Sequence, residues 1–235
     1  MLFIRRNYER GHTQNSWLNS HHTFSFGEYY DPKFMGVSHL KVINDDIVEA
    51  GMGFPTHSHQ NMEIISYVLE GALEHKDSMG NVSTIHEGEV QCMSAGTGIT
   101  HSEYNPSQTK LARFLQVWIT PNKKQLMPNY QQKMYTCEQK QGCLCLIASP
   151  DGQDGSMLIH QNAKLLNALI DEGESVSYSI DTRRLVYAHI ATGQIQINNI
   201  VLSEGDGATI RDESQITLMA EQQSEVLLFD LQDKH

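Results

Sequence analysis

Short apolar runs broken by turn-forming residues fill the chain between Val37 and Ile119. This rhythm is typical of antiparallel β-strands, because an amphipathic helix would repeat its apolar positions about every 3.6 residues over a longer stretch. The polar stretch from Asp77 to Asn81 separates two strand-like segments and is expected to form a hairpin loop. The pattern predicts strands at Val37 to Ile43, Ile64 to Leu69, Val90 to Met93 and Phe114 to Ile119.

The same rhythm returns in the second half of the chain, after a polar, Gln-rich stretch from residue 122 to 142 that carries Pro128. We expect this stretch to connect an N-terminal domain, 1–121, to a C-terminal domain, 143–235. Asn162 to Ile170 is the best candidate for a short helix. Further strands are predicted at Leu144 to Ala148, Leu185 to Ile190, Ile195 to Ile200 and Val226 to Leu231.

The two halves carry a weak repeat. Tyr67 to Gly71 is echoed by His189 to Gly193, and Glu87-Gly88-Glu89 is echoed by Glu204-Gly205-Asp206. A glycine that follows a strand and precedes an acidic turn occurs in many unrelated β proteins, so the repeat has low specificity. It suggests that one β module has been duplicated.

Composition and charge restrict the function classes. Hydrophobic residues make up 39% of the 235 residues and charged residues 19%, which is ordinary for a folded globular protein. The formal net charge is −11, with Lys and Arg not clustered, so direct nucleic-acid binding is not expected. No stretch approaches the ~20 apolar residues of a membrane span, and the polar start does not resemble a signal peptide. We expect a cytoplasmic protein that is a monomer.

Four cysteines lack the paired spacing of structural zinc sites, and a reducing compartment disfavours disulfides. All four are interpreted as core or surface thiols: Cys92, Cys137, Cys143 and Cys145. Cys143 and Cys145 would lie on the same side of a strand, so a soft-metal or redox role stays an alternative for this pair.

Two short segments each place a pair of metal-ligand residues at a spacing of two. His57-Ser58-His59 follows one Gly-rich stretch, and His101-Ser102-Glu103 follows another. Side chains on a strand alternate between faces, so the two members of each pair point the same way. Two such strands facing one point inside a β module would bring four ligands to one metal ion. The pairing distinguishes this pattern from a lone exposed histidine.

Three imidazoles and one carboxylate suit a borderline divalent ion and match Ca(II) or Mg(II) poorly. The candidates are Fe(II), Mn(II), Ni(II), Cu(II), Co(II) and Zn(II), and affinity order alone does not choose among them. Glu63 lies near His59 in the sequence and could be a fifth ligand, but a role beside the ligands or at the rim is preferred. The remaining histidines lack a partner at ligand spacing and are expected in the core or on the surface: His12, His21, His22, His39, His75, His86, His160, His189 and His235.

These segments resemble the two cupin motifs, and more closely the chain resembles the pirin family. The cupin motifs extend from Gly51 to Gly71 and from Gly88 to Asn105. The resemblance extends from the N-terminal residues to Leu228-Phe229-Asp230. The stretches that carry it are His22 to Phe26, Tyr30 to Pro32, Val42 to Asp46, His57 to His59, Met93 to Ile99 and His101 to Asn105.

The resemblance implies an all-β bicupin, with two stacked antiparallel β-barrels (double-stranded β-helix). It places the metal in the N-terminal barrel on His57, His59, His101 and Glu103, which makes Glu63 a weaker candidate. It leaves a degenerate C-terminal barrel. It also implies one of two roles. The first is quercetin 2,3-dioxygenase activity, which opens a flavonol ring with O2 and for which we expect Fe(II) as the metal. The second is a non-catalytic, redox-responsive protein that modulates a partner such as a transcription regulator.

For the dioxygenase, Glu103 is expected to act as a general base toward the flavonol hydroxyl as well as to bind the metal. Phe24, Phe26 and Phe54 are candidates for an apolar lining around the aromatic substrate, with core packing as the alternative for each.

Overall fold

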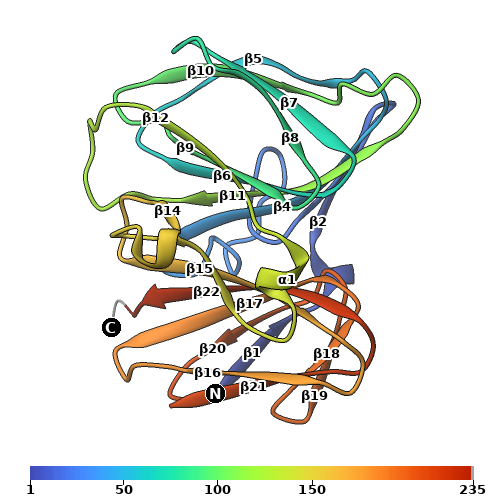
Figure 1. The fold of residues 1–235 in the computed structure, drawn as a ribbon, viewed down its shortest axis with the longest axis vertical. Helices are drawn as coiled ribbons and strands as arrows, with labels where there is room; N and C mark the ends of the chain where they lie inside the picture. The colour runs from blue at the N-terminus through green and yellow to red at the C-terminus, as the bar shows by residue number, and fades with distance from the viewer. Residues whose placement is uncertain (234–235) are drawn as a thin grey trace. The chain divides into compact units, whose positions relative to one another are not determined.

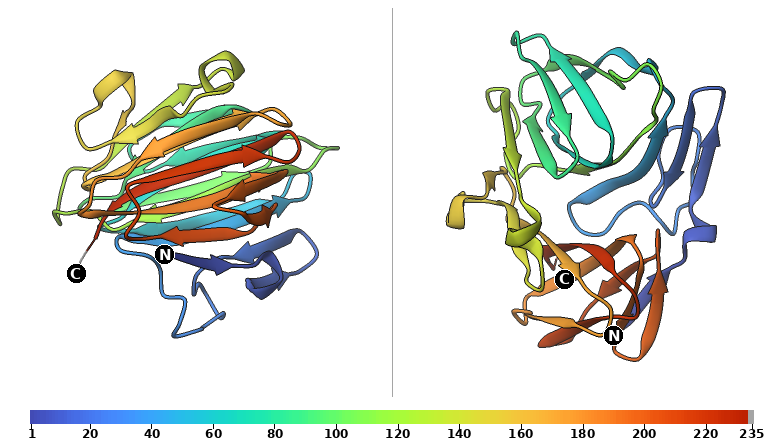
Figure 2. Two further views of the ribbon diagram at one scale, coloured as in Figure 1. Left: turned by 90° about the horizontal axis from the view of Figure 1, so that it is seen from below. Right: turned by 45° about the vertical axis from the view of Figure 1, so that its right-hand side comes forward.

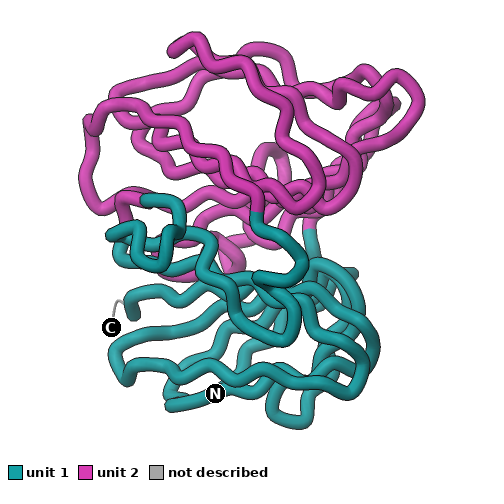
Figure 3. The backbone as a smooth tube through the Cα atoms, viewed as in Figure 1, with its two compact units in different colours: residues 1–10, 135–158, 162–235 teal, residues 11–134, 159–161 magenta. Residues whose placement is uncertain are grey.

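The computed structural model describes residues 1–233 and consists almost entirely of β-strands (Figure 1). Its residues cluster into two compact units, coloured separately in Figure 3. We name residues 11–134 with 159–161 the N-terminal unit, and residues 1–10, 135–158 and 162–235 the C-terminal unit. No helix within residues 1–233 is long and apolar enough to cross a membrane. His235, expected to have a core or surface role, lies outside the described residues.

The N-terminal unit contains one sheet of seven strands and one of four, and all of its strand pairs are antiparallel. The two sheets face each other, as the right-hand view of Figure 2 shows. The large sheet has the order β12 (Asn129–Met134), β9 (Glu89–Ser94), β6 (Glu63–Glu70), β11 (Ala112–Ile119), β4 (Leu40–Val48), β3 (Leu18–His22), β2 (Gly11–Gln14). The small sheet has the order β5 (Gly53–His59), β10 (Ile99–Tyr104), β7 (Ala72–Asp77), β8 (Val82–His86).

The C-terminal unit also contains a seven-stranded and a four-stranded sheet. The large sheet has the order β1 (Leu2–Arg5), β20 (Gly207–Ile210), β17 (Arg184–Thr192), β22 (Ser224–Gln232), β15 (Ala163–Ile170), β13 (Cys145–Ser149), β14 (Met157–Leu158). The small sheet has the order β16 (Ser175–Ser179), β21 (Gln215–Ala220), β18 (Gln194–Ile197), β19 (Ile200–Ser203). The described helices are short: α1 (Cys137–Lys140) and 3-10 turns at Asn7–Glu9 and Gln153–Gly155.

The two units repeat one strand order. The order β9-β6-β11-β4 in one large sheet corresponds to β20-β17-β22-β15 in the other, and β5-β10-β7-β8 corresponds to β16-β21-β18-β19. Gly71 and Gly193 follow the equivalent strands β6 and β17 with φ of +76° and +82°. A Cβ at either glycine would meet a backbone oxygen, so both positions need glycine for conformation and for space. This agrees with the duplication suggested by the sequence repeat.

Most of the strands expected from the sequence overlap observed ones, and the hairpin loop expected at Asp77 to Asn81 joins β7 to β8. The helix expected at Asn162 to Ile170 is wrong, because this segment forms β15. Its Ala, Leu and Lys residues favour a helix, but pairing with β13 on one side and β22 on the other decides the outcome. The single strand expected at Ile195 to Ile200 is also wrong. Asn198 and Asn199 both have positive φ and turn the chain into a β18–β19 hairpin.

Two segments belong to sheets that their position along the chain did not suggest. β1 pairs with β20 of the C-terminal unit, and β12, within the expected connector, pairs with β9 of the N-terminal unit. The domain limits 1–121, 122–142 and 143–235 stay a prediction. The all-β class is confirmed, whereas the closure of each pair of sheets into a barrel, and the stacking of two barrels, stay predictions.

Candidate metal centre

The neighbouring strands β5 and β10 bring three histidines together. In their antiparallel register His101 lies opposite His57, and Ile99 lies opposite His59. β5 is an edge strand, and a bulge next to Pro55 accommodates the missing backbone N–H of that proline. The ring centroids of the three imidazoles lie 4.5–4.8 Å apart. One nitrogen from each ring fits within a group whose members are all within 4.8 Å of one another.

The free nitrogens of this group suit a divalent ion. His57 donates from Nδ1 to the carbonyl oxygen of Pro55 at 2.8 Å, which leaves its Nε2 as the nitrogen with a free lone pair. The Nε2 of His101 is buried, and no residue within 1–233 forms a hydrogen bond with it. A buried imidazole nitrogen without a partner is costly unless a ligand completes it. The residues therefore fit a borderline transition-metal ion.

The protonation state of two of the imidazoles also favours metal binding. Burial is the main reason that the pKa of His59 falls to about 4, and the neighbouring His101 and His57 contribute to this lowering. Burial, His57 and His75 lower the pKa of His101 to about 3. Both rings are therefore neutral near pH 7, so a metal ion would not have to displace a proton from either.

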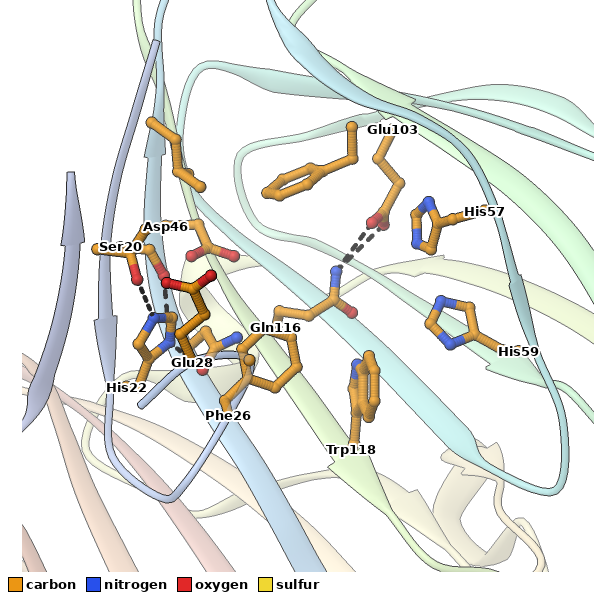
Figure 4. A pocket seen from close by; sticks show the side chains of 15 residues that line it. Ser20, His22, Phe26, Glu28, Asp46, His57, His59, Glu103, Gln116 and Trp118 are labelled. Atoms are coloured by element: carbon orange, nitrogen blue, oxygen red, sulfur yellow. Dashed lines mark hydrogen bonds between the residues drawn. The ribbon is translucent and has the colours of Figure 1, made fainter. Parts of the chain in front are cut away.

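Glu103 reaches from the small sheet toward the large sheet. Its carboxylate is 2% exposed and accepts hydrogen bonds from Ser66 Oγ at 3.1 Å and from Gln116 Nε2 at 3.0 Å. Figure 4 shows this carboxylate held by Gln116 next to His57. Glu103 belongs to a second group of potential ligands, which it forms with His75 and His101. The structure thus joins the three expected histidines in one group and Glu103 to His101 in the other, while the four-ligand assignment stays a prediction.

The expectation that His75 would have no ligand-like partner is wrong. His75 is fully buried on β7, directly opposite Glu103, and its Nδ1 lies 3.4 Å from Nδ1 of His101. Its Nε2 lies 3.1 Å from Oδ2 of Asp77. The sequence did contain a signal, because His75-Lys76-Asp77 has the same spacing of two that identified the other pairs.

A cavity of about 300 Å³ opens beside the histidines (Figure 4). Two of the expected aromatic residues, Phe26 and Phe54, line it, whereas Phe24 is a buried core residue outside this lining. Trp118 was not anticipated. Its ring packs edge-on against His59 with the centroids 4.9 Å apart. One wall of the cavity is thus formed by aromatic side chains next to the histidines.

The wall on β3 and β4 is polar. His22 donates from Nδ1 to Asn44 Oδ1 at 2.9 Å, and its Nε2 lies 2.9 Å from the Thr13 hydroxyl. Asp46 is 3% exposed, and no hydrogen bond to its Oδ1 is formed within residues 1–233. The pKa of Asp46 is raised to about 7, mainly by burial. A hydrogen bond from Ser20 opposes this rise, and the charges of Asp45 and Glu103 add to it.

Glu63 lies in a different environment from the ligand groups. It is buried at the start of β6, accepts a hydrogen bond from Ser94 Oγ at 2.7 Å and contacts His160 Nδ1 at 3.4 Å. It is not among the residues that line the cavity. All four cysteines are free thiols, and neither ligand group found among residues 1–233 includes one.

The chain matches known proteins over nearly its whole length. Residues 4–119 match the family model described as "Pirin", and residues 146–231 match one described as "Quercetinase C-terminal cupin domain". The quercetin 2,3-dioxygenase of Escherichia coli strain K12 is 49% identical over 98% of this chain and 99% of that protein. The solved structure of YhhW from Escherichia coli has a TM-score of 0.96 at 47% identity, covering 100% of this chain and 99% of that chain. A structure of the bacterial pirin YhhW in complex with nickel(II) has a TM-score of 0.94 at 47% identity, with 99% of both chains covered.

Proposed function

This chain belongs to the pirin family, and on that premise we propose that it is a metal-dependent dioxygenase that opens the ring of a flavonol such as quercetin with O2. The fold we propose is the bicupin of two stacked barrels. The reaction takes place in the N-terminal unit, in the cavity beside His57, His59 and His101. The relative named quercetin 2,3-dioxygenase supports the reaction class, and the three gathered imidazoles support the site.

The proposed ligands are His57, His59, His101 and Glu103. Fe(II) is our first choice, and nickel(II) is the ion named with the related YhhW structure. A bound ion would supply the redox and Lewis-acid chemistry that couples the flavonol to O2. The chain's own contribution is to present neutral imidazoles and a held carboxylate beside the cavity.

The cavity walls fit a flat, polyhydroxylated aromatic molecule. Trp118, Phe26 and Phe54 offer aromatic surface for its rings. Asn44 and Asp46 on the polar wall offer hydrogen-bonding groups for hydroxyls remote from the histidines. With its pKa near 7, Asp46 exists in part as a neutral acid and can donate a hydrogen bond to a substrate oxygen.

Glu103 is the proposed general base. Its carboxylate lines the same cavity as His57 and His59, and Gln116 and Ser66 fix its orientation through hydrogen bonds. A carboxylate held in this way can take the proton of a flavonol hydroxyl placed beside the histidines. Removal of that proton makes the ring electron-rich, which favours its oxidation.

The observation that carries the proposal is the group of three histidine nitrogens beside an aromatic-lined cavity. Its test is incubation of Fe(II)-loaded protein with quercetin in air, with flavonol absorbance and CO release recorded together. We expect bleaching and CO in air, binding without bleaching under anaerobic conditions, and no bleaching by the metal-free protein. Equal bleaching by metal-free protein, or none by any loaded form, contradicts the dioxygenase and favours the protein-modulating role.

A further inference from the structure

Two buried side chains on β7 stand behind His101, on the side away from His57. β10 lies between β5 and β7, so His101 has His57 opposite it on one neighbour and Asp77 opposite it on the other. The side chains of His75 and Asp77 are both 0% exposed. A buried ionisable pair beside a metal-ligand candidate needs a reason for its presence.

The directions of the hydrogen bonds follow from chemistry. The Asp77 carboxylate can only accept, so His75 donates to it from Nε2 at 3.1 Å. A neutral His75 then has a lone pair on Nδ1. The contact of 3.4 Å between the two Nδ1 atoms fits a donation from His101 to such a lone pair. In that arrangement His101 carries its proton on Nδ1 and its free lone pair on Nε2.

We propose that Asp77 and His75 form a hydrogen-bonded relay that positions His101 and fixes the tautomer whose Nε2 binds the metal. That nitrogen is the buried one with which no residue of the described chain bonds. In His57, at the exposed edge of the sheet, the carbonyl oxygen of Pro55 accepts the Nδ1 proton and likewise leaves Nε2 free for a metal ion. For His101 the relay supplies the equivalent hydrogen bond, and the carboxylate behind it makes His101 a more basic ligand.

Both members of the relay are themselves fixed. Asp77 accepts hydrogen bonds at the β7–β8 turn from the backbone of Met79 and from both the backbone and the side chain of Asn81. Burial raises the pKa of Asp77, but hydrogen bonds from Asn81, His75 and Met79 outweigh burial and leave it below its ordinary value. The ring of Tyr130 on β12 covers His75, with the centroids 4.9 Å apart. Asp77 is thus a fixed carboxylate rather than a mobile one.

The relay rests on the metal site of the proposed function, but not on the flavonol reaction. It also differs from the alternative in which His75 is itself a ligand in the group with His101 and Glu103. That alternative places the metal near the Nδ1 atoms, where the relay has a proton. The two arrangements therefore predict opposite tautomers of His101.

The first test is titration of the metal-free protein with Zn(II) against a chelator of known affinity. Asp77→Asn and His75→Phe should weaken Zn(II) binding about 10- to 100-fold, the usual cost of losing an outer hydrogen-bond partner of a ligand. His75→Gln should lose less than His75→Phe, because its side-chain oxygen can accept the His101 proton. Glu74→Gln is the matched control, since this carboxylate lies on the same strand and pairs with Lys76 near the surface. Unchanged affinity in Asp77→Asn and His75→Phe overturns the relay.

The second measurement needs no variant. Nitrogen-15 NMR of the imidazoles in the Zn(II)-loaded wild-type protein reports where each proton and each metal bond lies. We expect His101 with its proton on Nδ1 and Zn(II) on Nε2, and His75 with its proton on Nε2. Zn(II) bound to His75, or to Nδ1 of His101, overturns the relay. The result is independent of whether quercetin is a substrate, so failure of the dioxygenase proposal is seen separately.

Discussion

The N-terminal and C-terminal units share one strand order but differ in what their small sheets present to the interior. Counting from the equivalent Gly71 and Gly193, His75 corresponds to Ile197. On the neighbouring strand, His75 of β7 lies opposite Glu103 of β10, and Ile197 of β18 lies opposite Leu218 of β21. The next strand of each small sheet is β5 or β16. There, the opposed residues His57 and His101 correspond to Tyr178 and Ile216. Chemistry-bearing residues thus occupy positions that are mostly aliphatic in the other unit.

The large sheets differ in the same way. From the paired registers, the polar residues Asn44, Asp46, Ser66 and Gln116 correspond to Leu166, Ala168, Ala188 and Leu228. The four C-terminal residues belong to one continuous apolar cluster. Where the N-terminal unit has Trp118 beside its cavity, the C-terminal unit has Asp230, which accepts hydrogen bonds from Tyr178 and Arg184. The comparison teaches that this strand order folds around either interior, and that the polar one gives up apolar burial to hold a site.

Loss of metal is the largest effect we expect. His57→Ala, His59→Ala and His101→Ala should each retain less than about a tenth of the wild-type metal, since even outer-shell changes cost about 10- to 100-fold in affinity. Elemental analysis after dialysis measures the content, and circular dichroism checks the fold. His160→Ala, outside the ligand groups, should keep its metal. Full occupancy in all three variants would remove the basis for the site.

Leu218→Ala tests the other side of the comparison. Truncation of this fully buried side chain should lower the free energy of unfolding by about 2–5 kcal/mol, because a cavity is left in a close-packed core. Metal content should not change. Chemical denaturation followed by circular dichroism measures the loss. Met219→Ala, the partly exposed neighbour on β21, should cost less than about 0.5 kcal/mol. Equal losses in the two variants would mean that the C-terminal interior does not depend on its packing.

Glu103→Gln separates the base from the ligand. Gln keeps the size and one oxygen but removes the charge and the basic site, so turnover of quercetin should fall about 100-fold or more. Metal content should fall by a smaller factor. Steady-state kinetics with parallel elemental analysis measures both, and Glu74→Gln should behave as wild type. Equal losses of metal and of turnover would assign Glu103 to binding alone.

Asp46→Asn concerns the pH dependence of the N-terminal unit. The pKa of Asp46 is about 7 in the folded chain, against an ordinary value of 3.8. Between these two pH values the folded state therefore binds one more proton at this carboxyl than the unfolded state does. Its contribution to stability is therefore present at low pH and is lost as pH rises from about 4 to about 7. From pH 5 to pH 7 the wild type should lose about 2 kcal/mol relative to the variant.

Tryptophan fluorescence during urea unfolding measures this difference, because both tryptophans, Trp17 and Trp118, lie in the N-terminal unit. The same pH slope in wild type and Asp46→Asn would show that the carboxyl titrates normally. The difference between the two proteins is the quantity of interest, since His59 and His101 contribute to the pH dependence of both.

Local sequence determined the features that depend on the alternation of side chains between the two faces of a strand. Alternation on a strand places His57 with His59 on one face without knowledge of the partner strands, and it also predicted the all-β class. The hairpin at Asp77 to Asn81 could also be predicted from local sequence, because turn conformations depend on the residues of the turn itself. The family resemblance added a fold and a reaction class to these local inferences.

Tertiary structure alone decided which strands are neighbours. β15 is a strand because β13 and β22 pair with it, although its residues favour a helix. His75 is important because β7 lies next to β10, and no local pattern states that adjacency. Asp46 and Trp118 line the cavity from β4 and β11 because the large sheet faces the small one. A pKa or a hydrogen-bond relay is a property of such packed surroundings, since burial and partners arise only when distant segments meet.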